Sequence, residues 1–247
     1  NPAGYGLQKT ARLNTLFTKN RNIEDVYYLG YGAGLWGGYA AFNVYSSSIA
    51  DIPVTELDDQ NRPLATGESF SAADRAFVFS YGRSLGGLGA TELGAAELAW
   101  GFSLKYIQQS LYESRASGAG LDAGLLYQTG ALRAGWSILN LVEPQMVWDT
   151  GNTDTVEFRQ RFGLAYALFD SLLISGELVV QKNDTLTGLG LEYSPLALFA
   201  LRAGTFTDHY VFGLGFNYAG LALDYAYVIP LDYLVEPTQK ISLGYVF

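Results

Sequence analysis

Charged residues recur among the small residues of alternating segments, and they are the side chains best suited to act on a solute. In residues 97–106, large apolar side chains such as Leu98 and Trp100 occupy the even positions. The charged residues Glu97 and Lys105 occupy odd positions. Successive side chains of a strand point to opposite faces, so these charges fall opposite the apolar side chains. The same parity predicts an inward-facing, lumen-lining set: Glu97, Lys105, Asp122, Arg133, Glu157, Arg159, Arg161, Glu177, Glu192, Arg202 and Asp224.

This charged set has two interpretations. It could be a selectivity lining that repels or guides solutes. Alternatively it forms Arg–carboxylate pairs that fill and stiffen the interior, because buried charges must be paired or solvated and arginine suits bidentate pairing. The roughly equal numbers of the two signs favour the structural interpretation, since an open channel more often separates the signs across a constriction.

No set of residues in this sequence predicts an active site. His209 is the only histidine, and the chain has no cysteine. Metal catalysis needs three or four converging ligands, and a hydrolase would have only His209 as its base. We therefore expect no enzyme activity, no cofactor and no metal.

Two loop features have alternative interpretations. Clustered carboxylates at residues 51–69 suit calcium, but their spacing is not that of an EF-hand, and a solvated acidic loop is the commoner case. Trp148, in a second long loop, could anchor at the lipid interface or contact a partner. The carboxylates of the first loop are Asp51, Glu56, Asp58, Asp59 and Glu68.

Strands with two different faces must position all these residues. In residues 239–247, Ile241, Leu243, Tyr245 and Phe247 alternate with small or polar residues. The pattern recurs along the chain, and its second face is mainly Gly, Ala and Ser with charges of both signs. Such a face suits a crowded wet lumen better than the open solvent around a β-sandwich. The many Tyr and Phe of the apolar face fit aromatic girdles at two membrane interfaces.

The pattern predicts an all-β fold: a closed antiparallel transmembrane β-barrel of about 14 strands, an even number. Tight turns alternate with long loops at 51–69, 142–155 and 229–238, which predicts that both termini are periplasmic. Two connections break the alternation, the long glycine-rich turn at 82–94 and the short loop at 207–209. The expected strands are 10–18, 25–34, 39–50, 70–82, 95–109, 116–128, 131–141, 156–168, 171–181, 185–194, 198–206, 209–218, 221–228 and 239–247.

Composition restricts the class of protein further. The net charge of −9 and 16% charged residues argue against nucleic acid as a partner, because phosphate binding needs clustered Lys and Arg. No stretch approaches about 20 consecutive apolar residues, which excludes a transmembrane helix. No signal peptide is visible at Asn1, so we expect that the start given is mature or truncated.

Several short motifs in order resemble the FadL-like outer-membrane proteins, and within them the PorV/PorQ branch. They are Asn1-Pro2-Ala3-Gly4, Ala50-Asp51-Ile52-Pro53, Leu104-Lys105-Tyr106-Ile107, Leu223-Asp224-Tyr225-Ala226-Tyr227 and Ser242-Leu243-Gly244-Tyr245-Val246-Phe247. The resemblance implies a fourteen-stranded barrel with Asn1, Pro2 and Ala3 inside or under the lumen. It also implies that Tyr245 and Phe247 belong to the signal read by the membrane-insertion machinery.

The resemblance implies two functions. FadL proteins move long-chain fatty acids or other hydrophobic molecules across the outer membrane, whereas PorV-like proteins serve secretion as partners in an assembly. This chain is shorter than both, with only residues 1–9 as the remnant of a hatch before a barrel at 10–247. We therefore expect a non-catalytic partner in an outer-membrane assembly, with a FadL-like transporter as the alternative. The expected partners are membrane lipid, other proteins or a hydrophobic ligand.

Overall fold

The computed structural model describes residues 1–20, 23–91 and 94–247, and almost all of them are in strands. The elements are the 3₁₀-helix η1 (Pro2–Leu7) and the strands β1 (Arg12–Asn20), β2 (Glu24–Leu35), β3 (Gly38–Leu57), β4 (Pro63–Thr91), β5 (Gly94–Leu111), β6 (Ser114–Thr129), β7 (Leu132–Val142), β8 (Gln145–Trp148), β9 (Thr153–Thr155), β10 (Arg159–Phe169), β11 (Leu172–Gln181), β12 (Asp184–Leu196), β13 (Phe199–Phe206), β14 (His209–Tyr218), β15 (Leu221–Pro230) and β16 (Thr238–Val246).

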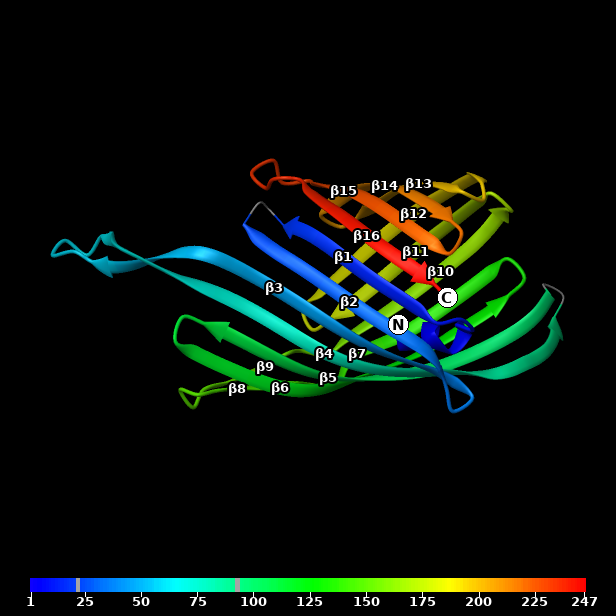
Figure 1. The fold of residues 1–247 in the computed structure, drawn as a ribbon, viewed down its shortest axis with the longest axis horizontal. Coiled ribbons are helices and arrows are strands. Elements are labelled where there is room, and N and C mark those ends of the chain that lie inside the picture. Colours follow the sequence, from blue (N-terminus) through cyan, green and yellow to red (C-terminus); the bar gives the residue numbers. More distant parts are fainter. Residues whose placement is uncertain (21–22, 92–93) are drawn as a thin grey trace.

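Within the described residues, the strands close into one antiparallel barrel (Figure 1). Each wall strand pairs with its neighbours along the chain, except that β7 pairs with β10, and β1 pairs with β16 to close the ring. The short strands β8 and β9 form a hairpin on β6 and leave fourteen strands in the wall. The predicted all-β, fourteen-stranded closed barrel is confirmed.

Large apolar side chains cover the outside of the wall. On β14, the side chains of Phe212 and Leu214 are 52% and 56% exposed. Gly213 and Gly215, which alternate with them, face Arg202. A Cβ atom on Gly215 would lie 2.9 Å from Arg202 Nη1, so glycine leaves room there for a charged side chain. This burial is inverted relative to a water-soluble domain and agrees with lipid around the barrel.

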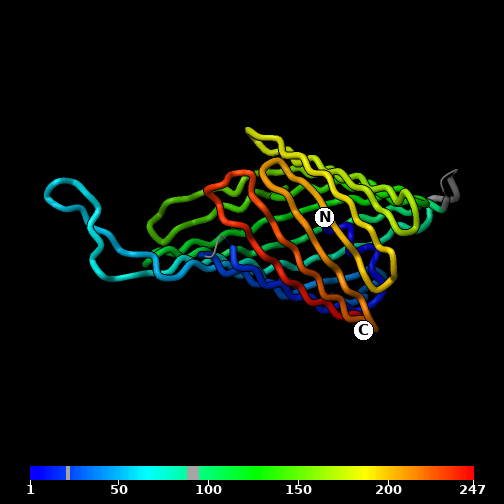
Figure 2. The backbone as a smooth tube through the Cα atoms, turned by 90° about the horizontal axis from the view of Figure 1, so that it is seen from above, coloured from blue at the N-terminus to red at the C-terminus, as the bar shows by residue number. Residues whose placement is uncertain are grey.

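The predicted loop at residues 51–69 is wrong. β3 and β4 stay paired as far as Leu57 and Pro63, so only residues 58–62 form the turn. Two register shifts interrupt the pairing, and Asp51 adopts a left-handed backbone (φ 55°) at the first. Because β-bulges accommodate residues typical of loops, the ribbon continues through them. Figures 1 and 2 show it in cyan, projecting beyond one end of the barrel.

The second predicted long loop, 142–155, contains the β8–β9 hairpin. Trp148 of β8 pairs with Ala116 of β6, beyond the point where β7 ends. The strand predicted at 156–168 begins only at Arg159, so Glu157 lies before the strand and not on it. Backbone pairing between distant strands, which alternation does not encode, sets these boundaries.

Two further connections differ from the sequence-based expectation. The glycine-rich turn expected at 82–94 is mostly strand, since β4 continues to Thr91 and β5 starts at Gly94, with residues 92–93 outside the described part. The strand expected at 185–194 continues through Pro195 to Leu196 in β12, and the chain reverses at 197–198. Backbone pairing between the strands again extends through Gly and Pro residues, which usually end strands.

Both ends of the barrel sequence lie at the same end of the barrel, because Arg12 pairs with Val246. Tight turns at 36–37, 130–131, 170–171, 197–198 and 219–220 lie at that end as well. The assignment of this end to the periplasm stays a prediction. Among the described residues no helix is long and apolar enough to cross a membrane.

Candidate functional site

The N-terminal segment lies inside the barrel, where Asn1 fixes it to the wall (Figure 1). Asn1 Nδ2 donates to the carbonyl oxygens of Leu125 (2.9 Å) and Trp136 (3.1 Å), which belong to the neighbouring strands β6 and β7. Asn1 Oδ1 accepts from the backbone N–H of Ala3 (3.0 Å) and caps η1. Pro2 and Ala3 are buried. The motif predicted to lie inside or under the lumen therefore contacts the lumen wall directly.

Glycines on three neighbouring strands form the seat of this segment. A Cβ atom on Gly101 would lie 2.4 Å from the Pro2 carbonyl oxygen, and one on Gly124 would lie 2.1 Å from Asn1 Oδ1. On Gly82 it would lie 2.5 Å from a backbone nitrogen of η1. Side chains at these positions would displace the segment, so its place is built into β4, β5 and β6.

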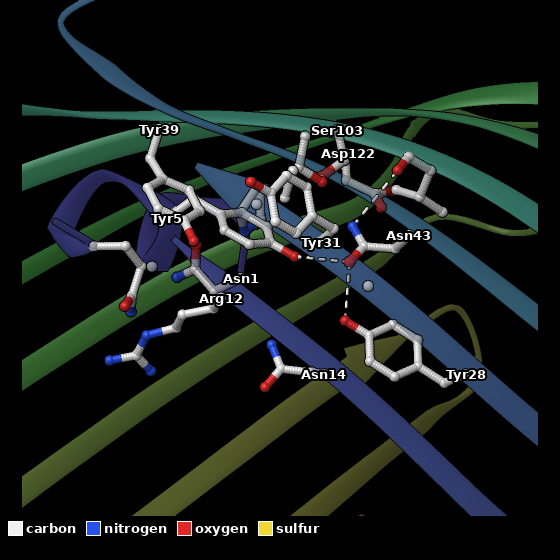
Figure 3. Close-up of a pocket in the computed structure, with 18 of the residues that line it drawn as sticks. Asn1, Tyr5, Arg12, Asn14, Tyr28, Tyr31, Tyr39, Asn43, Ser103 and Asp122 are labelled. Atoms are coloured by element: carbon white, nitrogen blue, oxygen red, sulfur yellow. Dashed lines mark hydrogen bonds between the residues drawn. The ribbon is translucent and has the colours of Figure 1, made fainter. Parts of the chain in front are cut away.

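A cavity of about 440 Å³ lies between η1 and the wall formed by β1–β4, and tyrosines form much of its lining (Figure 3). Tyr5 stacks on Tyr39 at a centroid distance of 6.0 Å, and Tyr28 packs against Tyr45 at 4.8 Å. Tyr39 is only 2% exposed, which fixes the first ring pair against the wall.

Asn43 of β3 connects the tyrosines at the centre of this cavity. Its Oδ1 accepts from the hydroxyls of Tyr28 (2.9 Å) and Tyr5 (3.3 Å), and its Nδ2 donates to the Val78 carbonyl (3.5 Å). None of these residues is among the site residues expected from the sequence. The signal was present, because Tyr28 and Tyr39 share strand parity with Gly30 and Ala41, on the small-residue face.

Two polar side chains of β1, Arg12 and Asn14, complete the lining. They are two residues apart, so they point to the same face of the strand. Among the described residues, no ion pair or side-chain hydrogen bond engages the Arg12 guanidinium or the Asn14 carboxamide. Both groups are exposed, and both line the cavity, so their donors are open to a solute there.

Seven of the eleven predicted lumen charges form ion pairs between strands, and the Arg202–Asp224 pair passes over β14. Arg202 contacts Glu192 and Asp224, each at 2.6 Å. The remaining pairs on the wall are Arg161–Glu177 at 2.8 Å and Lys105–Asp122 at 2.5 Å. The pairing supports the structural interpretation of these residues, and their role in selectivity stays a prediction.

The other four charges have different surroundings. Glu97 accepts from Ser84 Oγ and Gln128 Nε2, and Arg133 lines a second cavity of about 620 Å³. Glu157 lies in the loop before β10 and pairs there with Lys182. Arg159 is exposed at the first position of β10.

Asp122 also fixes a break in the wall. Its Oδ1 accepts the backbone N–H of Asn140, which has a left-handed backbone (φ 58°). The β6–β7 register shifts there, and the chain beyond β7 crosses the inner face of β6. Pro144 and Met146 are buried over Gly120 and Gly118, whose missing side chains make room for them. The wall is therefore irregular between β6 and β7, its sixth and seventh strands.

The loop residues have local partners. Asp58 accepts the backbone N–H of Arg62 and pairs with its guanidinium at 2.8 Å, and these bonds hold the pKa of Asp58 below its usual range. Trp148 Nε1 donates to Asp154, and His209 lies against Asp208. In the described parts of the chain, no three acidic or histidine side chains gather in a metal-binding arrangement.

The two C-terminal aromatic residues lie on the outer surface, where Tyr245 and Phe247 meet edge to face at 5.0 Å. The Phe247 N–H donates to the Ala11 carbonyl, beyond the end of β16. Their role as an insertion signal stays a prediction.

No family model matches this sequence, and no curated protein matches it. Several solved structures are similar to the structure of this chain. The Pseudomonas putida toluene transporter TodX is similar with a TM-score of 0.64 and 12% identity, over 100% of this chain and 90% of that one. A TodX mutant described as a monoaromatic hydrocarbon channel has the same TM-score and identity, over 100% and 91% of the two chains.

A Pseudomonas aeruginosa FadL homologue is also similar, with a TM-score of 0.60 and 10% identity over 100% of this chain and 92% of that one. At such identities the likeness is one of fold. The chain has the fold of FadL-like outer-membrane barrels, and that fold, together with the apolar outer surface, supports an outer-membrane location.

Proposed function

We propose that this protein carries small hydrophobic molecules across the outer membrane through the interior of its barrel, without catalysis. From the sequence alone we expected this function second, after partnership in an outer-membrane assembly such as a secretion system. Similar structures named as a toluene transporter and a hydrocarbon channel support the higher rank given to transport here.

The tyrosine-lined cavity is the observation that carries this proposal. Small-molecule sites are concave, mostly apolar spaces of roughly 300–1,000 Å³ with a few polar groups that orient the ligand. The cavity beside η1 has about 440 Å³, ring faces from Tyr28, Tyr39 and Tyr45, and the Asn43 carboxamide at its centre. It lies inside the barrel, between η1 and the wall.

The irregularity of the wall gives secondary support, because transport of a hydrophobic molecule favours an irregular wall over a sealed one. Just beyond β7, Glu143 accepts the N–H of Phe158, the residue before β10, and both residues line a further space of about 560 Å³. The cavity and the irregular wall are the two features that the transport hypothesis expects.

The test is the initial uptake of labelled toluene by bacterial cells that make the protein in their outer membrane. Asn14→Trp places a large ring in the cavity at an exposed position, and uptake should fall to that of cells without the protein. Thr15→Trp is the matched control, since Thr15 is the next residue of β1 and faces the outside. Equal uptake with and without the wild-type protein would refute transport of toluene.

A second candidate function, contact with other outer-membrane proteins in the manner of the PorV/PorQ branch, is favoured by the β3–β4 ribbon. Leu57 and Leu64 near its tip are 67% and 63% exposed, and Figure 1 shows the ribbon extending well past the other strands. Exposed apolar side chains on a projecting element are typical of contact sites.

This second function predicts that stoichiometric protein partners co-purify with the wild-type barrel from native membranes. Leu57→Lys combined with Leu64→Lys should abolish that association and leave toluene uptake unchanged. Purification of the wild-type barrel without any partner would rule the function out.

A further inference from the structure

Among the described side chains that line the tyrosine-lined cavity, one charge has no ionic partner. Its charged lining side chains, among the described residues, are Arg12 and Asp122. Asp122 is neutralised by Lys105 Nζ at 2.5 Å and accepts the Asn140 N–H. The Arg12 guanidinium has no such counterpart, so the cavity presents a net positive charge in a protein whose net charge is −9.

The open donors lie together. Arg12 and Asn14 project from the same face of β1 into the cavity, and Figure 3 shows Asn14 beside Tyr28 of the neighbouring strand β2. A guanidinium presents a planar fork of N–H donors that matches the two oxygens of a carboxylate, and the Asn14 amide adds another donor. The acceptors they lack must come from a ligand or from water.

The tyrosines that line the same cavity suit an aromatic body. Tyr28 and Tyr45 form one ring pair, and Tyr5 and Tyr39 form the other. Tyr28 and Tyr5 direct their hydroxyls to Asn43, which turns those polar groups toward a partner in the wall. Ring faces attract a further ring in offset or edge-to-face geometry.

We propose that this cavity binds a small aromatic carboxylate, with its ring among the tyrosines and its carboxylate on Arg12 and Asn14. The inference rests on the proposed transport function and narrows its substrate class. It differs from binding of a plain hydrocarbon, which would cover the guanidinium without giving it an acceptor, at a cost in free energy.

The test is calorimetric binding of benzoate to the purified full-length barrel in detergent at neutral pH. Arg12→Gln should weaken benzoate binding about tenfold or more, because it removes a charge-assisted pair. Arg133→Gln is the matched control: Arg133 also faces the lumen, but it lines the second cavity, so binding should change less than about twofold. Since Arg12 is exposed, the variant should fold, and circular dichroism checks this.

Two further ligands separate the contributions of the ring and the carboxylate. Cyclohexanecarboxylate, which has no aromatic ring, should bind the wild type about threefold or more weakly than benzoate. Toluene binding should not weaken in Arg12→Gln, because toluene offers the guanidinium no acceptor.

Equal benzoate affinity of the wild type and Arg12→Gln, or equal loss in Arg133→Gln, would overturn the assignment. Toluene uptake that Asn14→Trp blocks, without measurable benzoate binding, would leave transport intact and refute only the aromatic carboxylate. Absence of both would refute the two proposals together.

Discussion

The two halves of the barrel have different interiors, although their outer surfaces are alike. The half formed by β1–β8 packs against η1, and it holds most of the buried polar side chains, including Asn43, Ser80 and Ser103. The half formed by β10–β16 faces a wide glycine-lined cavity, and its ion pairs are partly exposed. The short N-terminal segment therefore fills only one side of the fourteen-stranded barrel, and the other side stays open to solvent.

The solvent exposure of the ion pairs differs between the two halves in the same way. The side chains of Lys105 and Asp122, in the filled half, are each 12% exposed. Those of Arg202 and Glu192, in the open half, are 38% and 35% exposed. Partly hydrated pairs contribute little to stability, whereas the loss of one partner of a buried pair leaves an uncompensated charge.

The largest effect is expected for Asp122→Ala. It leaves Lys105 and the Asn140 N–H without their buried acceptor, and it should lower the free energy of unfolding by about 3–5 kcal/mol. Urea unfolding in lipid vesicles measures this value. Asp122→Asn, which keeps an acceptor for Asn140, should lose less, and equal losses in the two variants would show that the irregular wall does not depend on this bond.

An arginine substituted on the lipid face should lower the stability of the inserted barrel equally in both halves. Leu29 of β2 and Leu214 of β14 are 53% and 56% exposed on the outer surface. Leu29→Arg and Leu214→Arg should each destabilise the inserted barrel by about 2–4 kcal/mol if the positions lie near the bilayer midplane. The same unfolding assay applies, with Leu214→Phe as the apolar control. Wild-type stability of either arginine variant would contradict the assigned parity.

Removal of a partner in the open half should have a smaller effect than Asp122→Ala. In Glu192→Gln, Arg202 keeps Asp224 at 2.6 Å and gains water, so the free energy of unfolding should fall by about 1 kcal/mol or less. A loss as large as that of Asp122→Ala would show that the two interiors do not differ in hydration.

The smallest effect is expected at the tip of the β3–β4 ribbon, outside both halves. The pKa of Asp58 is lowered by the Arg62 N–H and guanidinium, so the ordered turn is favoured above the unfolded pKa of 3.8 and is lost as pH falls through the folded value. Amide hydrogen exchange at Arg62 should quicken on acidification, beyond its intrinsic pH dependence. Asp58→Asn should remove that pH response, and its persistence would assign the response to another group.

The fold was predictable because its signal is local. Alternation of Leu214 with Gly213 and Gly215 requires only the period of a strand, and it indicated the lipid face, the lumen face and the approximate number of strands. The inward parity of Arg202 and Asp224 followed from the same pattern. What alternation could not give was the partner of each charge, since Lys105 reaches Asp122 across two paired strands.

The wrongly predicted loop and the missed cavity have a common physical origin. Asp51 and Pro53 have the chemistry of a loop, but the β3–β4 ladder continues past them because its backbone hydrogen bonds before and after the bulges outweigh local preference. The cavity was missed for a related reason. Tyr28 and Asn43 were inconspicuous in separate strands, and only strand pairing and η1 bring them together.

The sequence alone determined the solvent of each strand face, because burial of apolar side chains follows residue type and period two. Tertiary structure decided where the N-terminal segment sits, where the wall is irregular, and which donors stay open beside the tyrosines. Those features depend on register and closure, which are set by the sum of contacts between strands far apart in the chain and by no single segment.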